Sequence, residues 1–162
     1  MRPDIKVWNP ENPAQWNKTL AWTTVWLSTF SLTLGFCAWF LVPSLAPRLN
    51  EIGFSLTHSQ LYWLVAMVGL SAGTLRILWT FLPPILGTRI LVTLSTGLLL
   101  IPLFCWVYAA QHPDTPYWML ICFALLSGIG GGTFSGLMAS TNYFFPKHER
   151  GLALGIQGGL SD

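Results

Sequence analysis

Four long apolar stretches dominate this chain and restrict the structures that it can form. They lie at residues 20–46, 60–82, 88–110 and 116–145, and a fifth apolar segment begins near Gly151. A helix of about 20 apolar residues crosses the ~30 Å hydrocarbon core of a bilayer. Charged residues make up 9% of the chain, against about 25% in soluble domains. The sequence therefore predicts an all-α, polytopic membrane protein with four transmembrane helices and the start of a fifth.

The basic residues gather on one side of this predicted topology. We expect residues 1–19 to form a polar N-terminal arm and residues 20–162 to form the transmembrane region. The arm and the second and fourth loops contain six basic residues, whereas the first and third loops contain only Arg48. Cytoplasmic loops carry an excess of Lys and Arg. The pattern predicts a multi-pass protein of the cell (inner) membrane with a cytoplasmic N-terminus.

Arg76 is a basic residue inside the second apolar stretch, which contains no acidic residue. A guanidinium keeps its proton at physiological pH, and a charge at the bilayer centre costs ~2.5–3.5 kcal/mol or more. We expect Pro83-Pro84 to end the second span sharply, about six residues after Arg76. Two interpretations follow. Arg76 either extends its charge to the membrane interface, or it faces inward and binds a ligand or partner.

The fourth stretch is unusually rich in glycine. Gly128, Gly132 and Gly136 recur every four residues, and Gly151, Gly155 and Gly159 repeat this spacing in the fifth segment beside Gly158. Glycine rows allow helix backbones to approach closely in membranes. They predict a tightly packed pair of helices, either as a plain dimerisation face or as a groove where a ligand or a moving helix meets the backbone.

Several kinds of site are disfavoured by the remaining residues. Cys37, Cys105 and Cys122 are widely spaced within the predicted spans, where we expect them to be small buried hydrophobes. The three histidines fall in predicted loops, which disfavours haem ligation between helices. The basic residues form no patch, which argues against nucleic acid as a partner. We therefore expect no metal, no cofactor and no enzymatic activity.

The signature of a known family lies in residues 128–160, which read GIGGGTFSGLMASTNYFFPKHERGLALGIQGGL. The block Phe144-Phe-Pro-Lys147 followed by Gly151-Leu-Ala-Leu-Gly155 and Gly158-Gly159 is its most specific part. Together with Arg76 and the arm Trp8-Asn-Pro-Glu-Asn-Pro-Ala-Gln-Trp16, it resembles the nitrate/nitrite porter family of the major facilitator superfamily. The resemblance covers essentially the whole chain in one register.

This resemblance implies a transporter with two six-helix halves that face a central anion site. Each half of such a protein contributes one arginine and one aromatic ring, which here would be Arg76 and Phe134. The resemblance thus favours an inward-facing Arg76. A planar guanidinium fork suits a planar nitrate or nitrite ion. The absence of a carboxylate from the predicted spans favours nitrate/nitrite exchange over proton symport.

The chain departs from the family pattern at its end. The family continues the fifth helix as Gly-Asn-Met/Leu-Gly, whereas this chain has Leu160-Ser161-Asp162. We expect an N-terminal fragment that lacks the second arginine and the C-terminal half, and that is inactive alone. The alternative function is an autonomous four-helix exporter that dimerises. Such exporters need a membrane-embedded carboxylate, and here every Asp and Glu lies outside the predicted spans.

Overall fold

The computed structural model describes residues 9–161, and this part of the chain is built from helices. Asp162, where the family resemblance leads us to expect an amide, lies outside the described residues. The helices are α1 (Lys18–Leu45), η2 (Ala46–Arg48), α2 (Leu49–Ile52), α3 (His58–Leu86), α4 (Thr88–Gln111), α5 (Tyr117–Phe144) and α6 (Lys147–Ser161).

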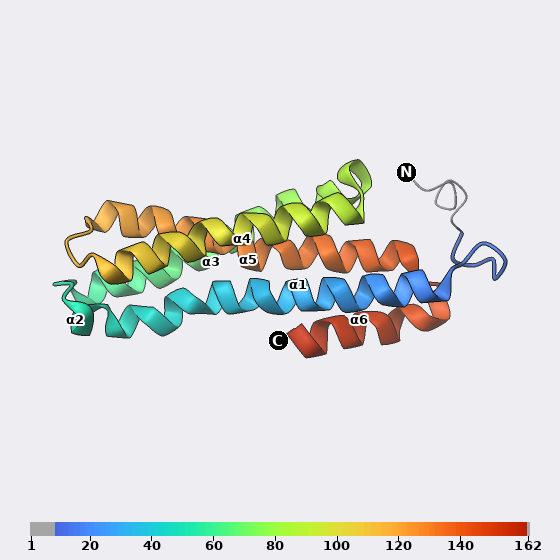
Figure 1. Ribbon diagram of the computed structural model, residues 1–162, viewed down its shortest axis with the longest axis horizontal. Helices are drawn as coiled ribbons and strands as arrows, with labels where there is room; N and C mark the ends of the chain where they lie inside the picture. The colour runs from blue at the N-terminus through green and yellow to red at the C-terminus, as the bar shows by residue number, and fades with distance from the viewer. Residues whose placement is uncertain (1–8, 162) are drawn as a thin grey trace.

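Four of these helices form an elongated antiparallel bundle (Figure 1). Residues 9–17, the α3–α4 turn and the α5–α6 turn lie at one end, and the α4–α5 turn lies at the other. Helix α5 contacts α1, α3 and α4, and its most extensive contact is with α3. Helix α6 packs mainly on α1. The central position of α5 brings its glycines against several neighbours.

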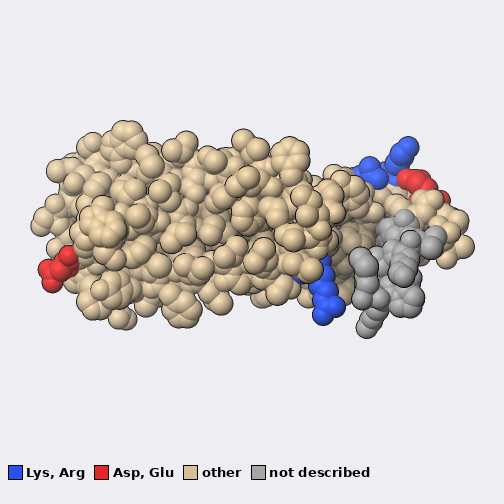
Figure 2. Space-filling model, turned by 90° about the horizontal axis from the view of Figure 1, so that it is seen from above, with Lys and Arg blue, Asp and Glu red and all other residues tan. Residues whose placement is uncertain are grey.

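The helices are long and apolar enough to cross a membrane. Four spans meet this description: Lys18–Ile52, His58–Leu86, Thr88–Gln111 and Tyr117–Phe144. The surface agrees with a membrane-spanning bundle. On the face shown in Figure 2, charged side chains lie toward the ends and the midsection is uncharged. The prediction of a polytopic all-α membrane protein is confirmed.

Local sequence explains where the helices begin. Thr57 caps α3, since its side chain accepts the backbone N–H of Gln60 at 3.3 Å and the Gln60 side chain accepts the N–H of Thr57 at 2.9 Å. This reciprocal pair satisfies two N–H groups that the first helical turn leaves free. Asn17 caps α1 by accepting the N–H of Leu20. Helix α1 therefore begins at Lys18, two residues before the predicted span.

The prediction that Pro83-Pro84 ends the second span is wrong. Helix α3 continues through both prolines to Leu86. The helix stops at Gly87, whose φ of 75° favours glycine and whose N–H donates to the carbonyl of Pro83 at 3.0 Å. Gly87 is also the whole connection to α4. As a result, Arg76 lies ten residues before the end of its helix, deeper than we expected.

Two predictions about cysteines and histidines also need correction. Cys37 and Cys122 are exposed and Cys105 is partly exposed on the bundle, in the sides of α1, α4 and α5 that face away from the other helices. His58 is the first residue of α3 and His148 lies in α6, so neither is in a loop. Both are at helix ends, because polar residues there remain near water.

Buried polar side chains join the helices in pairs. The indole of Trp79 donates to Ser95 at 2.9 Å between α3 and α4, and the indole of Trp106 donates to Ser127 at 2.9 Å between α4 and α5. Such bonds contribute ~0.6–2 kcal/mol each in membrane proteins. They fix how neighbouring helices rotate against one another.

Candidate anion site at Arg76

Arg76 lies at the depth of the bundle's centre. Its contact on α5 is Gly131, which is fourteen residues after Tyr117 and thirteen before Phe144, the ends of that helix. From Arg76 to the last residue of α3 the helix rises ~15 Å at 1.5 Å per residue. The Arg76 side chain points toward α5 at this depth and does not extend along its own helix to the membrane interface.

In the described part of the chain, the guanidinium of Arg76 has one hydrogen bond and no carboxylate beside it. Its Nε donates to the carbonyl oxygen of Gly131 at 3.2 Å, and the side chain is partly buried. Within residues 9–161, no Asp or Glu lies at ion-pair distance from Arg76. The guanidinium has five N–H donors. Its four Nη hydrogens are thus available to an acceptor from outside the described chain.

Aromatic rings on two helices flank this cation. The Cζ atom of Arg76 lies 5.7 Å from the ring centroid of Phe134 on α5 and 5.9 Å from that of Trp39 on α1. Phe36 supports both rings, with centroids 5.7 Å from each. Ring faces carry negative charge density and attract cations. The rings therefore stabilise the guanidinium without supplying the negative charge that would compete with a bound anion.

The glycines of α5 explain how these groups come together. A Cβ atom at Gly132 would lie 2.8 Å from Cβ of Leu75, and one at Gly136 would lie 3.0 Å from the carbonyl oxygen of Trp79. A Cβ atom at Gly128 would lie 2.5 Å from Cβ of Ser71. The Ser71 hydroxyl donates to the carbonyl of Leu125 at 2.5 Å. The backbones of α3 and α5 thus touch. This contact brings Arg76 within reach of a main-chain carbonyl on α5.

The expected close pairing of glycine rows between α5 and α6 is not formed in the described chain. A Cβ added at Gly151, Gly155 or Gly159 would meet no described atom within 4 Å, and one at Gly158 would meet only Cε of Met138, at 3.5 Å. Helix α6 instead buries Ala153 and Gln157. The reason is rotational, because these two residues and the glycine row lie on different faces of α6.

Sequence reasoning found two of the residues around the guanidinium and missed two others. It selected Arg76 and Phe134, which the structure brings together. It did not select Trp39, which lies in a different apolar stretch and has no motif of its own. It assigned Gly131 no role, although the GxxxG row of Gly128 and Gly132 surrounds it. A glycine directly beside a GxxxG row is a signal that could have identified this carbonyl.

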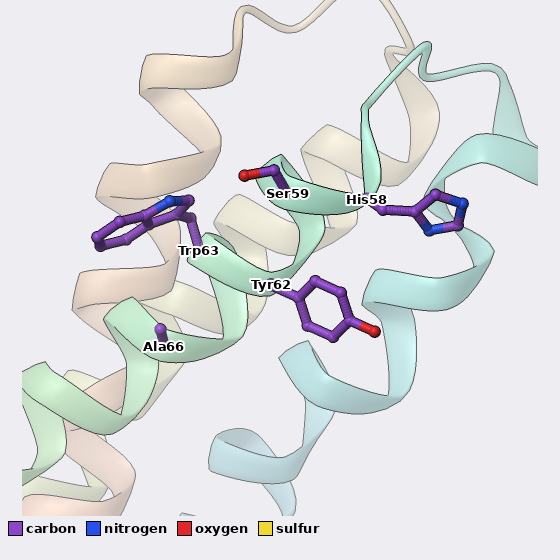
Figure 3. Close-up of a pocket in the computed structure, with 5 residues that line it drawn as sticks. All are labelled: His58, Ser59, Tyr62, Trp63 and Ala66. Carbon is purple, nitrogen blue, oxygen red and sulfur yellow. The ribbon is translucent and has the colours of Figure 1, made fainter.

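A hollow lies at the start of α3, far from Arg76. His58, Ser59, Tyr62, Trp63 and Ala66 line it, and Figure 3 shows Tyr62 and Trp63 projecting in different directions from the helix. Tyr62 is 75% exposed and Trp63 is 56% exposed. No Lys or Arg is among the residues that line this hollow. It has the character of an aromatic membrane-interface surface, and nothing in its lining favours an anion.

Comparison with known proteins agrees with this architecture. The family model described as Major Facilitator Superfamily matches residues 8–161. The chain is 59% identical over 158 residues to the probable nitrate/nitrite antiporter NarK2 of Thermus thermophilus. This match covers 98% of this chain and 36% of the relative. It is 42% identical to the nitrate/nitrite transporter NarU of Salmonella typhimurium over 96% of this chain, and 40% identical to NarU of Escherichia coli over 98%.

The chain spans about a third of the length of these relatives, since it covers 36%, 34% and 35% of them. The resemblance to nitrate/nitrite porters that the sequence motifs indicated is confirmed by these matches. With four membrane-spanning helices and a family match over nearly its full length, this chain belongs to the Major Facilitator Superfamily.

Proposed function

We propose that this chain forms the N-terminal segment of a secondary transporter that carries nitrate, nitrite or both, and that Arg76 and Phe134 bind the anion. The observation that carries this proposal is a partly buried guanidinium at mid-depth of a membrane bundle, flanked by rings and without a carboxylate at ion-pair distance within residues 9–161. The names of the relatives supply the substrate class.

The chemistry of the site fits a small oxyanion. Nitrate and nitrite are planar and present two oxygens that a guanidinium fork can bind at once. In partly dry surroundings the attraction between unit charges exceeds its value in water. Phe134 offers an apolar face that can stack on the plane of the anion. The hydrogen bond from Nε to Gly131 leaves the Nη edge for this purpose.

The remainder of the transporter completes the site in this proposal. We expect a second arginine and a second ring from a C-terminal half, so that residues 1–162 alone do not transport. The α6 glycine row, which has an open face in the described chain, adds a surface on which further helices can pack. Exchange of nitrate for nitrite fits the lack of carboxylates in the middle of the four spans.

Uptake into proteoliposomes tests this function. The complete transporter should accumulate labelled nitrate when the vesicles contain nitrite, and chloride or sulfate inside should not substitute for it. Vesicles that contain only residues 1–162 should show background uptake. Absence of nitrate and nitrite uptake by the complete, folded transporter would refute the proposed substrate class.

We also propose a cytoplasmic location for the N-terminal arm in an inner membrane, because six basic residues lie on that side. After replacement of the three native cysteines by alanine, Asn12→Cys and Ser55→Cys provide a matched pair at opposite ends of α1. An impermeant maleimide added to intact spheroplasts should label Ser55→Cys alone. Labelling of Asn12→Cys under these conditions would reverse the orientation.

A further inference from the structure

Trp39 lies where the three helices of the site meet. Its ring centroid is 5.9 Å from Cζ of Arg76 on α3. Its ring atoms Cε2 and Cδ2 also lie 3.2 and 3.3 Å from the point that a Cβ at Gly131 would occupy on α5. The same indole therefore touches the cation and the residue whose carbonyl accepts the Arg76 Nε–H.

The position of Trp39 is set by close contact between α1 and α5. One turn earlier on α1, Gly35 meets Gly130, and a Cβ at Gly35 would lie 3.2 Å from the Gly130 carbonyl oxygen. The missing side chains at Gly130 and Gly131 allow the indole to lie directly over the α5 backbone. Phe36 also packs on the ring, 5.7 Å from Trp39 between centroids. The ring thus contacts both α5 and an aromatic neighbour on its own helix.

We propose that Trp39 is a positioning residue for anion binding, which holds the Arg76 guanidinium against the Gly131 carbonyl with its Nη edge free. This inference rests on the proposed function and adds α1 to the site. An arginine side chain has many rotamers, and fixing them before the anion arrives removes an entropic cost from binding. Trp has the strongest cation–π attraction of the aromatic side chains, and it leaves the net positive charge of Arg76 in place.

The role differs from that of Phe134. Both rings face the guanidinium, but the contact of Trp39 with Gly131 also couples the cation to the α1–α5 packing. A change at Trp39 should release Arg76 even when no anion is present. This separation allows the positioning role to be measured without relying on nitrate.

The first experiment observes the Arg76 Nε–H in the 162-residue chain, by nitrogen-15 NMR of arginine side chains in lipid nanodiscs. Loss of one resonance in Arg76→Lys assigns the signal. We expect Trp39→Leu to shift that signal and to increase its exchange with water at least about fivefold, whereas Trp39→Phe retains a protected signal. An unchanged, protected Arg76 signal in Trp39→Leu would overturn the proposal whether or not the protein binds nitrate.

The second experiment measures nitrate Kd by equilibrium binding to the complete transporter. Trp39→Leu should weaken nitrate binding about tenfold, which lies between the effects of an exposed and a desolvated cation–π contact, and Trp39→Phe should remain within about threefold of wild type. Wild-type affinity in Trp39→Leu would contradict the proposal. If wild type itself fails to bind nitrate, the proposed function fails, and the NMR result still decides the positioning role.

Two other tryptophans are matched controls. Trp26 lies on α1 and is 54% exposed, so Trp26→Leu should change neither the Arg76 signal nor the nitrate Kd. Trp106 is buried and bonds Ser127, so Trp106→Phe should lower the Tm while leaving the Kd of the folded protein unchanged. A general loss of packing would make Trp39→Leu behave like Trp106→Phe, and that outcome would also overturn the proposal.

Discussion

The Nε–H of Arg76 donates to the carbonyl oxygen of Gly131 at 3.2 Å, and this bond joins the middle of α3 to the middle of α5. In a regular helix the carbonyl of residue i already accepts the N–H of residue i+4. The arginine uses the second lone pair of this oxygen. A main-chain acceptor orients the guanidinium and adds no full negative charge to the site.

The two glycine rows should respond differently to the same change. Gly132→Leu should lower the free energy of unfolding of the chain by about 1–3 kcal/mol or more, because its Cβ would lie 2.8 Å from Cβ of Leu75. Gly155→Leu is the matched control. Gly155→Leu should leave the free energy of unfolding unchanged or raise it by up to ~0.8 kcal/mol. The surroundings of Gly155 are open, and leucine has a higher helix propensity than glycine.

Unfolding of both glycine variants in mixed detergent micelles measures this difference. Equal destabilisation would show that α6 packs through its glycine row after all. In the complete transporter, Gly132→Leu should also abolish nitrate uptake, because it separates Arg76 from Gly131.

Gln157 is the central residue of a buried polar link between three helices. Its amide Nε2 donates to Ser28 on α1 at 2.9 Å, and its Oε1 accepts from Thr141 on α5 at 2.6 Å. Gln157→Leu should therefore lower the unfolding free energy by ~1–2 kcal/mol. Thr74→Val is the control, because the Thr74 hydroxyl is exposed and, among residues 9–161, bonds only its own helix, at the carbonyl of Leu70. Similar unfolding midpoints for the two variants would contradict the link.

Residues 11 and 16 of the N-terminal arm form hydrogen bonds with the end of α5 and the start of α6. The carboxylate of Glu11 accepts the backbone N–H of Lys147 at 3.0 Å, and the indole of Trp16 donates to the carbonyl of Phe144 at 2.9 Å. Glu11→Ala removes an acceptor from a helix N-terminus, a change that costs ~0.5–2 kcal/mol. Amide hydrogen exchange at Lys147 should accelerate about two- to thirtyfold.

The control for this contact is Glu51→Ala, at the opposite end of the bundle. It should leave exchange at Lys147 unchanged. An unaltered rate at Lys147 in Glu11→Ala would show that the arm does not hold α6 in solution.

The sequence predicted the helical spans because their signal is long and local. Runs of 20 or more apolar residues identify membrane helices without knowledge of their neighbours. Helix ends are harder to predict: two prolines in the last turn of α3 predict a stop, yet the helix ends at Gly87, whose positive φ favours glycine. The choice between these signals depends on three-dimensional packing.

The candidate site was predicted in part for the same reason. A charged residue in an apolar run is visible in sequence, so Arg76 was selected. Trp39 is one of nine tryptophans, and its proximity to Arg76 depends on the contact of Gly35, on its own helix, with Gly130 on α5. For the glycine row of α6, by contrast, the sequence pattern predicts a packed face that the described chain does not form. Gly151, Gly155 and Gly159 have the spacing of a packed face, but the rotation of α6 decides which face is buried.

The most direct test of the account is nitrate binding by Arg76→Lys in the complete transporter, with Arg89→Lys near the end of the bundle as the matched control. Lysine keeps the charge but replaces a planar fork with a point charge. We predict at least a tenfold increase in nitrate Kd and loss of most uptake for Arg76→Lys, with Arg89→Lys close to wild type. Wild-type affinity and uptake in Arg76→Lys would contradict the account, because an arginine that only anchors the helix at the interface is replaced by lysine without loss.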